Sequence, residues 1–204
     1  MGEHTALVTP FGLDSPAVSV APSLLGCSLI AHDVQVRLTE VEAYGGEGQD
    51  PGSHAHRGRT PRSEIMFGPP GRLYVYFAYG MHWCANVVTG PDGEASAVLL
   101  RAGEVADGLD TARGRRPRVS DRDLCRGPAR LAKTMALDGT ALGLDLLDPL
   151  SPVRLLAGSS DPARVRTGPR VGVSGEGGAR AWRFWLDGEP TVSPYRPAVR
   201  RVRA

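Results

Sequence analysis

The sequence has only one lysine and few long apolar runs, and the scarcity of such runs argues against a membrane-spanning protein. The longest stretch that resembles a membrane segment is residues 95–100, far shorter than the roughly 20 residues that span a bilayer. We therefore expect no membrane association. The N-terminal residues also lack a basic segment followed by an apolar one, so no secretory signal is expected.

Cysteine is also scarce. Cys27, Cys84 and Cys125 lie far apart and have neither disulfide-framework nor zinc-site spacing. Such a pattern favours buried thiols in a reducing compartment, so we expect a cytoplasmic protein without a bound metal.

The rest of the composition is that of a globular chain. Its 204 residues are 41% hydrophobic, which suits one domain spanning residues 1–204. The 26 glycines and 17 prolines favour strands and turns over a helical bundle. We find no internal repeat and no long linker. Residues 1–15 are expected to be flexible, and residues 108–121 to form an exposed, arginine-rich loop.

Positive charge is concentrated in the second half of the chain. Residues 1–100 hold 5 arginines and 10 acids, whereas residues 101–204 hold 18 arginines, the lysine and 12 acids. A basic surface suits a nucleic-acid backbone, which arginine can grip through two donors at once. A GC-rich genome that encodes arginine in place of lysine would give the same pattern, so charge alone leaves both interpretations open.

Hydrophobic periodicity predicts a mixed α+β domain. It has a mostly antiparallel, curved β-core, a protruding β-hairpin and surrounding helices. A helix is expected within residues 15–27, capped by Ser15, and another from Pro128. The expected strands are residues 34–44, 72–79, 82–88, 95–102, 170–173 and 181–186, of which the second and third form the hairpin.

Two acids in the first long strand break its pattern. In an uninterrupted strand, alternation would place Glu40 and Glu42 on the face that Val34, Val36 and Leu38 bury. A carboxylate on an apolar face costs several kcal/mol unless it is paired, neutral or open to a cleft. Either the acids serve a cleft, or the strand bulges or leaves the core so that both acids meet solvent. The pattern alone does not decide between these alternatives.

The hairpin is dense in tyrosine. Tyr74 and Tyr76 share one face, Phe77 and Tyr79 share the other, and Tyr79 lies near the expected tip. Aromatic residues favour strands and most often pack in a core. Flat rings beside a cleft also sandwich a nucleobase, and a residue at a hairpin tip can wedge into a duplex.

Several motifs together resemble one family, the alkyladenine (3-methyladenine) DNA glycosylases. They occur in the family's order from about residue 37 to 193, and the tyrosine hairpin combined with EVEAY is highly specific. The matching segments are EVEAY (40–44), SHAHRGRTPR (53–62), MF (66–67), GRLYVYFAYGM (71–81), Asn86, AVLLRA (97–102), CRGPARL (125–131) and PRVGV (169–173).

This resemblance implies a monofunctional enzyme of base-excision repair. Such an enzyme flips a damaged purine out of duplex DNA through the minor groove and hydrolyses its N-glycosidic bond, leaving an abasic site. The implied substrates are 3-methyladenine, 7-methylguanine, hypoxanthine and etheno-adenine, and the implied form is a monomer without cofactors. The implied site residues are Glu42 and Arg101 for catalysis, Tyr44, His54, Tyr76 and Asn86 for the base pocket, and Tyr79 and Met81 for intercalation.

In detail, the resemblance implies that Glu42 activates water, that Arg101 supports this water and a nearby phosphate, and that Asn86 clashes with the guanine amine. The loop before His54 is one residue longer than the family pattern, so His56 is an alternative to His54 in the pocket wall. A carboxylate suits this chemistry because it both stabilises an oxocarbenium-like transition state and deprotonates water.

Strand cleavage requires an amine that forms a Schiff base, and the sole lysine, Lys133, falls in a predicted helix. We therefore expect no lyase activity. Two other functions stay open on the sequence. One is a metal-dependent hydrolase that uses His54, His56, His82 and Cys84 as ligands. The other is a DNA-damage-binding module without catalysis.

Overall fold

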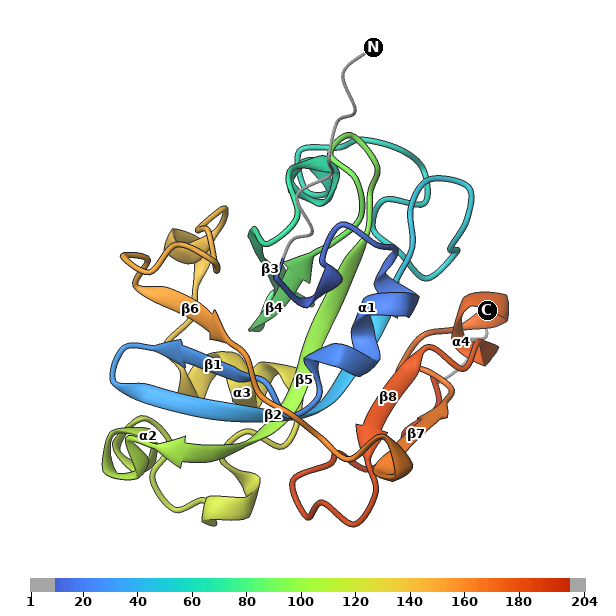
Figure 1. Ribbon diagram of the computed structural model, residues 1–204. Coiled ribbons are helices and arrows are strands. Elements are labelled where there is room, and N and C mark those ends of the chain that lie inside the picture. The colour runs from blue at the N-terminus through green and yellow to red at the C-terminus, as the bar shows by residue number, and fades with distance from the viewer. Residues whose placement is uncertain (1–9, 199–204) are drawn as a thin grey trace.

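The computed structural model describes residues 10–198, and its eight strands form one sheet with helices around it (Figure 1). The strands are β1 (Ser28–Ala31), β2 (Val34–Tyr44), β3 (Leu73–Ala78), β4 (His82–Val88), β5 (Ala97–Asp107), β6 (Val153–Leu156), β7 (Val165–Gly168) and β8 (Arg183–Leu186). The α-helices are α1 (Ala17–Leu24), α2 (Leu109–Arg115), α3 (Pro128–Thr134) and α4 (Gly175–Ala179). Short 3-10 turns are η1 (Pro10–Gly12), η2 (Glu64–Phe67), η3 (Asp121–Asp123), η4 (Gly139–Ala141) and η5 (Pro162–Arg164).

Every strand pairing is antiparallel, and the main order is β3-β4-β5-β2-β1-β6. Strand β2 is central. It pairs with β5 along its length on one side, and on the other with β1 near its start and with β8 at Glu40–Glu42. The predicted α+β class with an antiparallel β-core is therefore confirmed. Because β2 has neighbours on both edges at Glu40–Glu42, its backbone there is enclosed by the sheet.

The second half of β2 is buried on both faces. The strand predicted at residues 34–44 is present, and its pairing with β5 is irregular between Leu38 and Val41, as the alternative with a bulge expected. Residues of β2 in the main apolar cluster are even-numbered up to Leu38 and then odd-numbered at Val41 and Ala43. A bulge-like irregularity thus exists, yet Glu40 and Glu42 do not meet solvent, since both are 0% exposed. The acids remain buried and must be satisfied by partners within the protein.

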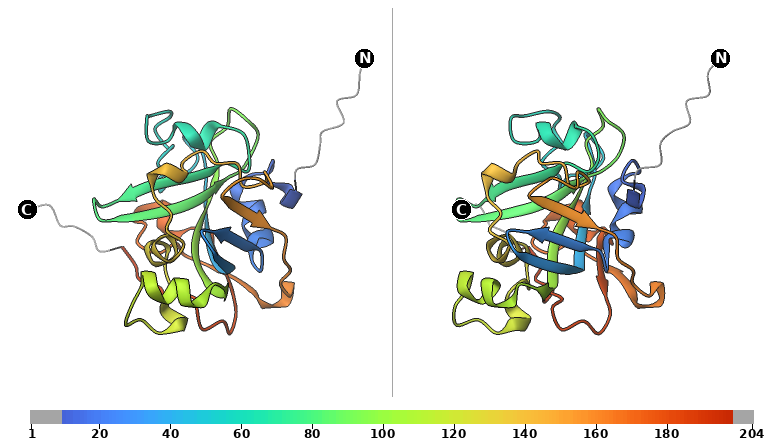
Figure 2. Two further views of the ribbon diagram at one scale, coloured as in Figure 1. Left: turned by 90° about the vertical axis from the view of Figure 1, so that its left-hand side faces the viewer. Right: turned by 60° about the vertical axis from the view of Figure 1, so that its left-hand side comes forward.

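The predicted hairpin is confirmed as β3 and β4, which extend away from the body of the molecule (left view of Figure 2). Its turn is closed by the Met81 amide, which donates to the Ala78 carbonyl at 3.0 Å. The two central residues both have positive φ, 52° at Tyr79 and 66° at Gly80, as the tight primed hairpin turns require. On the hairpin, Phe77 packs against Trp83 with ring centroids 4.8 Å apart.

Three local predictions are corrected. Residues 108–121 are mostly exposed but contain helix α2, which packs through the buried Ala112 and is therefore not a loop throughout. Helix α1 has Pro16, not Ser15, at its N-cap position. Residues 170–173 form an irregular segment and a turn, not a strand.

The helix predicted from Pro128 is confirmed as α3, with proline in its first turn, where the missing N–H costs nothing. In the N-terminal segment predicted to be flexible, residues 1–9 lie outside the described residues. Within the described part, Leu13 is fully buried in the main apolar cluster. No helix in residues 10–198 is long and apolar enough to cross a membrane.

Candidate active site

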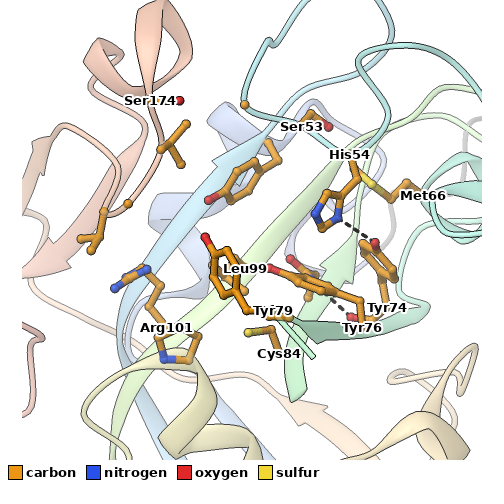
Figure 3. Close-up of a pocket in the computed structure, with 18 of the residues that line it drawn as sticks. Ser53, His54, Met66, Tyr74, Tyr76, Tyr79, Cys84, Leu99, Arg101 and Ser174 are labelled. Atoms are coloured by element: carbon orange, nitrogen blue, oxygen red, sulfur yellow. Dashed lines mark hydrogen bonds between the residues drawn. The ribbon is translucent and has the colours of Figure 1, made fainter. Parts of the chain in front are cut away.

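A cavity of about 350 Å³ opens beside the β3–β4 hairpin (Figure 3). Strands β2, β3, β4 and β5 supply one part of its lining, and the irregular segments around residues 51–54 and 171–174 supply another. The side chains that matter for its chemistry are Tyr44, His54, Tyr74, Tyr76, Tyr79, Cys84, Asn86 and Arg101. Segments far apart in the sequence therefore converge on one pocket.

Three aromatic rings form one wall. The Nδ1 atom of His54 lies 2.9 Å from the Tyr74 hydroxyl, and its ring meets that of Tyr76 edge-on at a centroid distance of 4.6 Å. Burial, assisted by the positive charge of Arg62, lowers the pKa of His54 to about 4, so the imidazole is neutral near pH 7. Burial raises the pKa of Tyr74 and that of Tyr76, and both phenols stay protonated. The wall is thus uncharged, with the His54 ring nearly perpendicular to both tyrosine rings.

Asn86 and Cys84 lie on β4 behind this wall. The Nδ2 atom of Asn86 donates to the backbone carbonyl of Tyr74 at 3.0 Å, and the side chain is 4% exposed. Asn86 therefore both lines the pocket and fixes the hairpin backbone. Burial raises the pKa of the Cys84 thiol, which keeps it protonated and unreactive.

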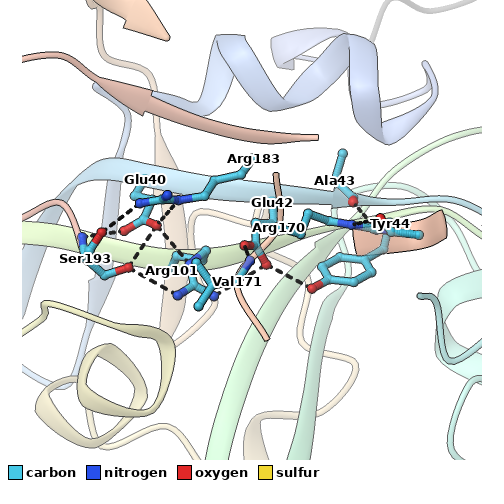
Figure 4. A network of polar contacts seen from close by, with 10 residues as sticks. Glu40, Glu42, Ala43, Tyr44, Arg101, Arg170, Val171, Arg183 and Ser193 are labelled. Atoms are coloured by element: carbon cyan, nitrogen blue, oxygen red, sulfur yellow. Dashed lines mark hydrogen bonds and ion pairs between the residues drawn. The ribbon is translucent and has the colours of Figure 1, made fainter. Parts of the chain in front are cut away.

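Glu42 does not line the pocket but is bonded to Tyr44, Arg101 and Val171, which do (Figure 4). Its Oε1 accepts from the Val171 amide at 2.7 Å, and its Oε2 accepts from the Tyr44 hydroxyl at 2.9 Å and from Arg101 Nη1 at 3.4 Å. All three donor residues line the pocket, whereas Glu42 itself is 0% exposed. The carboxylate is thus one hydrogen bond away from the cavity.

Arg101 connects Glu42 to Glu40. Its Nε donates to Glu40 Oε1 at 3.0 Å, and its Nη2 donates to the Ser193 hydroxyl at 3.2 Å. Glu40 also accepts from Arg183 Nε at 2.6 Å and from the Ser193 amide at 2.7 Å. Although burial acts in the opposite direction, the two carboxylates raise the pKa of Arg101. The guanidinium is therefore charged and fixed in direction.

Two further charges were missed by sequence reasoning. Arg170 and Asp50 are both 0% exposed and form a two-bond ion pair, with both distances at 2.6 Å. Burial would raise the pKa of Asp50, but the bonds from Arg170 outweigh it and lower that pKa. Among the described residues the buried charges balance, three of each sign: Glu40, Glu42, Asp50, Arg101, Arg170 and Arg183.

The outer rim of the pocket is exposed and basic. Tyr79 and Met81, at the hairpin tip, are 86% and 66% exposed. A neighbouring groove shares Arg101 and Val171 with the pocket and is lined by four more arginines: Arg122, Arg126, Arg130 and Arg196. The predicted loop 108–121 does not supply these arginines.

The structure gathers most of the predicted site residues at one place. Tyr44, His54, Tyr76, Tyr79, Asn86 and Arg101 line the cavity, Glu42 is bonded to its wall, and Met81 lies beside Tyr79 at the tip. His54 lines the cavity and His56 does not. No group of three or more His, Cys, Asp or Glu side chains within residues 10–198 could hold a metal ion, so nothing there supports the metal-hydrolase alternative.

Comparison with known proteins gives a consistent result. Residues 12–190 match the model of a family described as methylpurine-DNA glycosylase (MPG). A protein of Streptomyces avermitilis is 53% identical over 195 residues, which cover 92% of this chain and 91% of that protein. A protein of Nocardia farcinica is 54% identical, and the match covers 91% of this chain and 92% of that protein. A protein of Mycobacterium tuberculosis is 47% identical, and the match covers 90% of this chain and 91% of that protein. All three are named "Putative 3-methyladenine DNA glycosylase".

Proposed function

The chain belongs to the methylpurine-DNA glycosylase family, and we propose that it excises alkylated or deaminated purines from duplex DNA with Glu42 activating the attacking water. Membership makes it a DNA glycosylase, a hydrolase of base-excision repair whose substrate is DNA. The residue roles below are our proposals. The observation that carries them is the buried Glu42 carboxylate bonded to residues that line an aromatic pocket.

In this proposal the flipped base enters the cavity and stacks on Tyr44 and Tyr76, with His54 completing the wall. The neutral rings suit a planar, uncharged or cationic purine, since the π-face of an aromatic ring attracts positive charge. Candidate substrates are 3-methyladenine, 7-methylguanine, hypoxanthine and etheno-adenine. Asn86 excludes normal guanine by a clash with its exocyclic amine, and its bond to the Tyr74 carbonyl holds it in place for that role.

Hydrolysis depends on the carboxylate. As the glycosidic bond breaks, positive charge develops on the sugar, and a fixed anion lowers the energy of that state. A carboxylate has about four acceptor positions, and Val171, Tyr44 and Arg101 use three of them. The remaining position of Oε1 accepts the proton of a water that enters from the pocket. In this proposal Arg101, held by Glu40, supports the water and an adjacent phosphate of the DNA.

The hairpin tip opens the duplex. We propose that Tyr79 enters the minor groove, fills the space of the extruded nucleotide, and is flanked by Met81. Their exposure at the end of a projecting hairpin supports this role. The pocket and the proposed wedge lie in one chain, which supports a monomeric enzyme. We also propose that it needs no cofactor and acts in the cytoplasm. Its product is an abasic site with an intact strand.

The deciding experiment is the Glu42→Gln variant in a single-turnover assay on a hypoxanthine-containing duplex. Glutamine keeps the shape of the side chain but cannot take a proton, and its amide nitrogen cannot accept the hydrogen bonds that reach one of the two carboxylate oxygens. We expect the excision rate to fall by about 10²–10⁴-fold while DNA affinity is retained. Glu104→Gln, a matched change on β5 at an exposed side chain that pairs with Arg37, should leave the rate unchanged. Excision by Glu42→Gln at the parental rate would refute the role of Glu42.

A further inference from the structure

The buried Arg170–Asp50 pair takes no part in the mechanism above, although it adjoins the site. Asp50 comes from the segment after β2, and Arg170 from the segment after β7, 120 residues later. Removing two opposite charges from water is costly, and the cost is recovered only when geometry and hydrogen bonding are complete. The stability of the pair therefore depends on the hydrogen bonds that each partner makes.

All five N–H groups of Arg170 are used. Two reach the Asp50 carboxylate at 2.6 Å each, one reaches the Ala43 carbonyl at 2.8 Å, and two reach the Gly177 carbonyl at 2.7 and 3.2 Å. Asp50 in turn accepts from the amides of Gly45 and Gly52 at 3.1 and 3.0 Å. One guanidinium thus ties together β2, the segment that follows it, and helix α4.

These contacts involve the residues that bond or neighbour Glu42. The Arg170 side chain bonds the carbonyl of Ala43, and its guanidinium lies over the Tyr44 ring at 4.5 Å from the centroid (Figure 4). The amide of the next residue, Val171, donates to Glu42 Oε1. Tyr44, stacked on Arg170, donates to Glu42 Oε2. Two of the three donors on the Glu42 carboxylate are therefore attached to Arg170, one through the chain and one through stacking.

The packing leaves Arg170 no alternative position. A Cβ at Gly52 would lie 2.7 Å from Arg170 Nη2, and one at Gly177 would lie 2.7 Å from the Gly52 amide. Real Cβ atoms essentially never approach other heavy atoms this closely, so a side chain at either place would force the neighbouring atoms to shift. The guanidinium is enclosed by backbone on these sides.

We propose that Arg170, fixed by Asp50, is a positioning residue that holds the Val171 amide and the Tyr44 hydroxyl on the Glu42 carboxylate. This inference rests on the proposed role of Glu42 as the water-activating base. Hydrogen bonds to a carboxylate favour its charged form, so we expect loosening these donors to change how the excision rate depends on pH. The other charged groups around Glu42 are Arg101, Glu40 and Arg183, which bond one another and not Arg170, whereas Tyr44 is stacked on Arg170.

The test is the pH dependence of the single-turnover excision rate on a hypoxanthine duplex. Arg170→Lys keeps the charge but loses the two-bond ion pair and the planar stack on Tyr44. In this variant we expect the acidic limb of the pH–rate profile to shift to higher pH by about one pH unit. The rate should recover toward the parental value on the alkaline side, and affinity for the duplex should change less than threefold. Arg37→Lys, a matched change in a partly exposed ion pair on β2, should leave the limb unmoved.

Gly52→Ala gives a milder displacement that does not depend on the fold tolerating lysine. Its Cβ pushes the guanidinium without removing any charge, so the acidic limb should move in the same direction. Gly114→Ala, where a Cβ meets no atom within 4 Å, is its control. If Gly52→Ala and Arg170→Lys fold and the acidic limb of their pH–rate profiles does not move, while Glu42→Gln is inactive, the inference about Arg170 is wrong and the proposed function still holds. An active Glu42→Gln overturns the proposed function instead.

Discussion

At the scale of single residues, the site depends on charge that is buried and fully paired. Glu42 is tolerated at 0% exposure because three donors compensate its lost hydration. Removing one partner of such a buried pair generally costs about 3–5 kcal/mol, because the other charge is left uncompensated. In the proposed mechanism, the groups that compensate this buried charge also orient the carboxylate for proton transfer.

His54 makes the stability of the protein depend on pH. Its pKa is lowered from the usual 6.5 to about 4 in the folded protein. Between these values the unfolded chain binds more protons than the folded one, so stability falls as the pH is lowered through this window. We expect the melting temperature to fall from pH 7 to pH 4.5 by more in the parent than in His54→Gln.

Thermal unfolding of both proteins at the two pH values measures this difference. Titration of the Asp50 carboxylate does not affect this comparison of melting temperatures. Its pKa is already lowered from 3.8, so the stability that it contributes is lost only below that pH. An equal decrease in both proteins would show that His54 is not held neutral by the fold.

At the scale of elements, the β3–β4 hairpin places tyrosine in a backbone conformation that it disfavours. Tyr79 has φ of 52° and an 86% exposed side chain, so its ring gains nothing from packing. A left-handed conformation costs a residue with a Cβ about 1–2 kcal/mol, and less for asparagine. The proposed wedge role of Tyr79 is thus in conflict with stability at this position, as is common at sites under strain.

The Tyr79→Asn variant separates these two effects. We expect a gain in unfolding free energy of up to about 1 kcal/mol, because asparagine tolerates the left-handed region. Excision from duplex DNA should fall, since the proposed wedge is lost. Denaturant unfolding and a single-turnover assay measure the two changes. Tyr195→Asn is the matched control, since Tyr195 is also exposed but is not among the positive-φ residues. A destabilised Tyr79→Asn with normal excision would contradict both expectations.

At the scale of the whole molecule, the chain offers almost no amine for Schiff-base chemistry. Its one lysine, Lys133, is exposed on α3 and does not line the pocket. We therefore expect no enzyme–DNA adduct when borohydride is added during excision, and no strand cleavage on a denaturing gel. Lys133→Met should excise at the parental rate. An adduct that accumulates in the parent and disappears in Lys133→Met would identify a lyase.

The sequence by itself determined the local elements and the residue types of the site. Alternation predicted β2, the tyrosine-rich hairpin and its tip, and Pro128 predicted the start of α3, because these depend on neighbouring residues. The family resemblance then assembled Glu42, Tyr44, Tyr76 and Asn86 into one hypothesis before any geometry was known. Prediction from local pattern failed where that pattern is ambiguous, as in helix α2 and residues 170–173.

Only the tertiary structure decided the state of Glu42. On the sequence it was either a solvated acid or a cleft residue, whereas it is a fully buried carboxylate with three donors. Those donors come from β2, β5 and a segment 129 residues away, and the Arg170–Asp50 pair that braces them spans 120 residues. Periodicity reports which face a residue occupies, but not which distant charge will meet it there. Pairing between buried charges is set by the sheet, since only the folded backbone brings them within hydrogen-bonding distance.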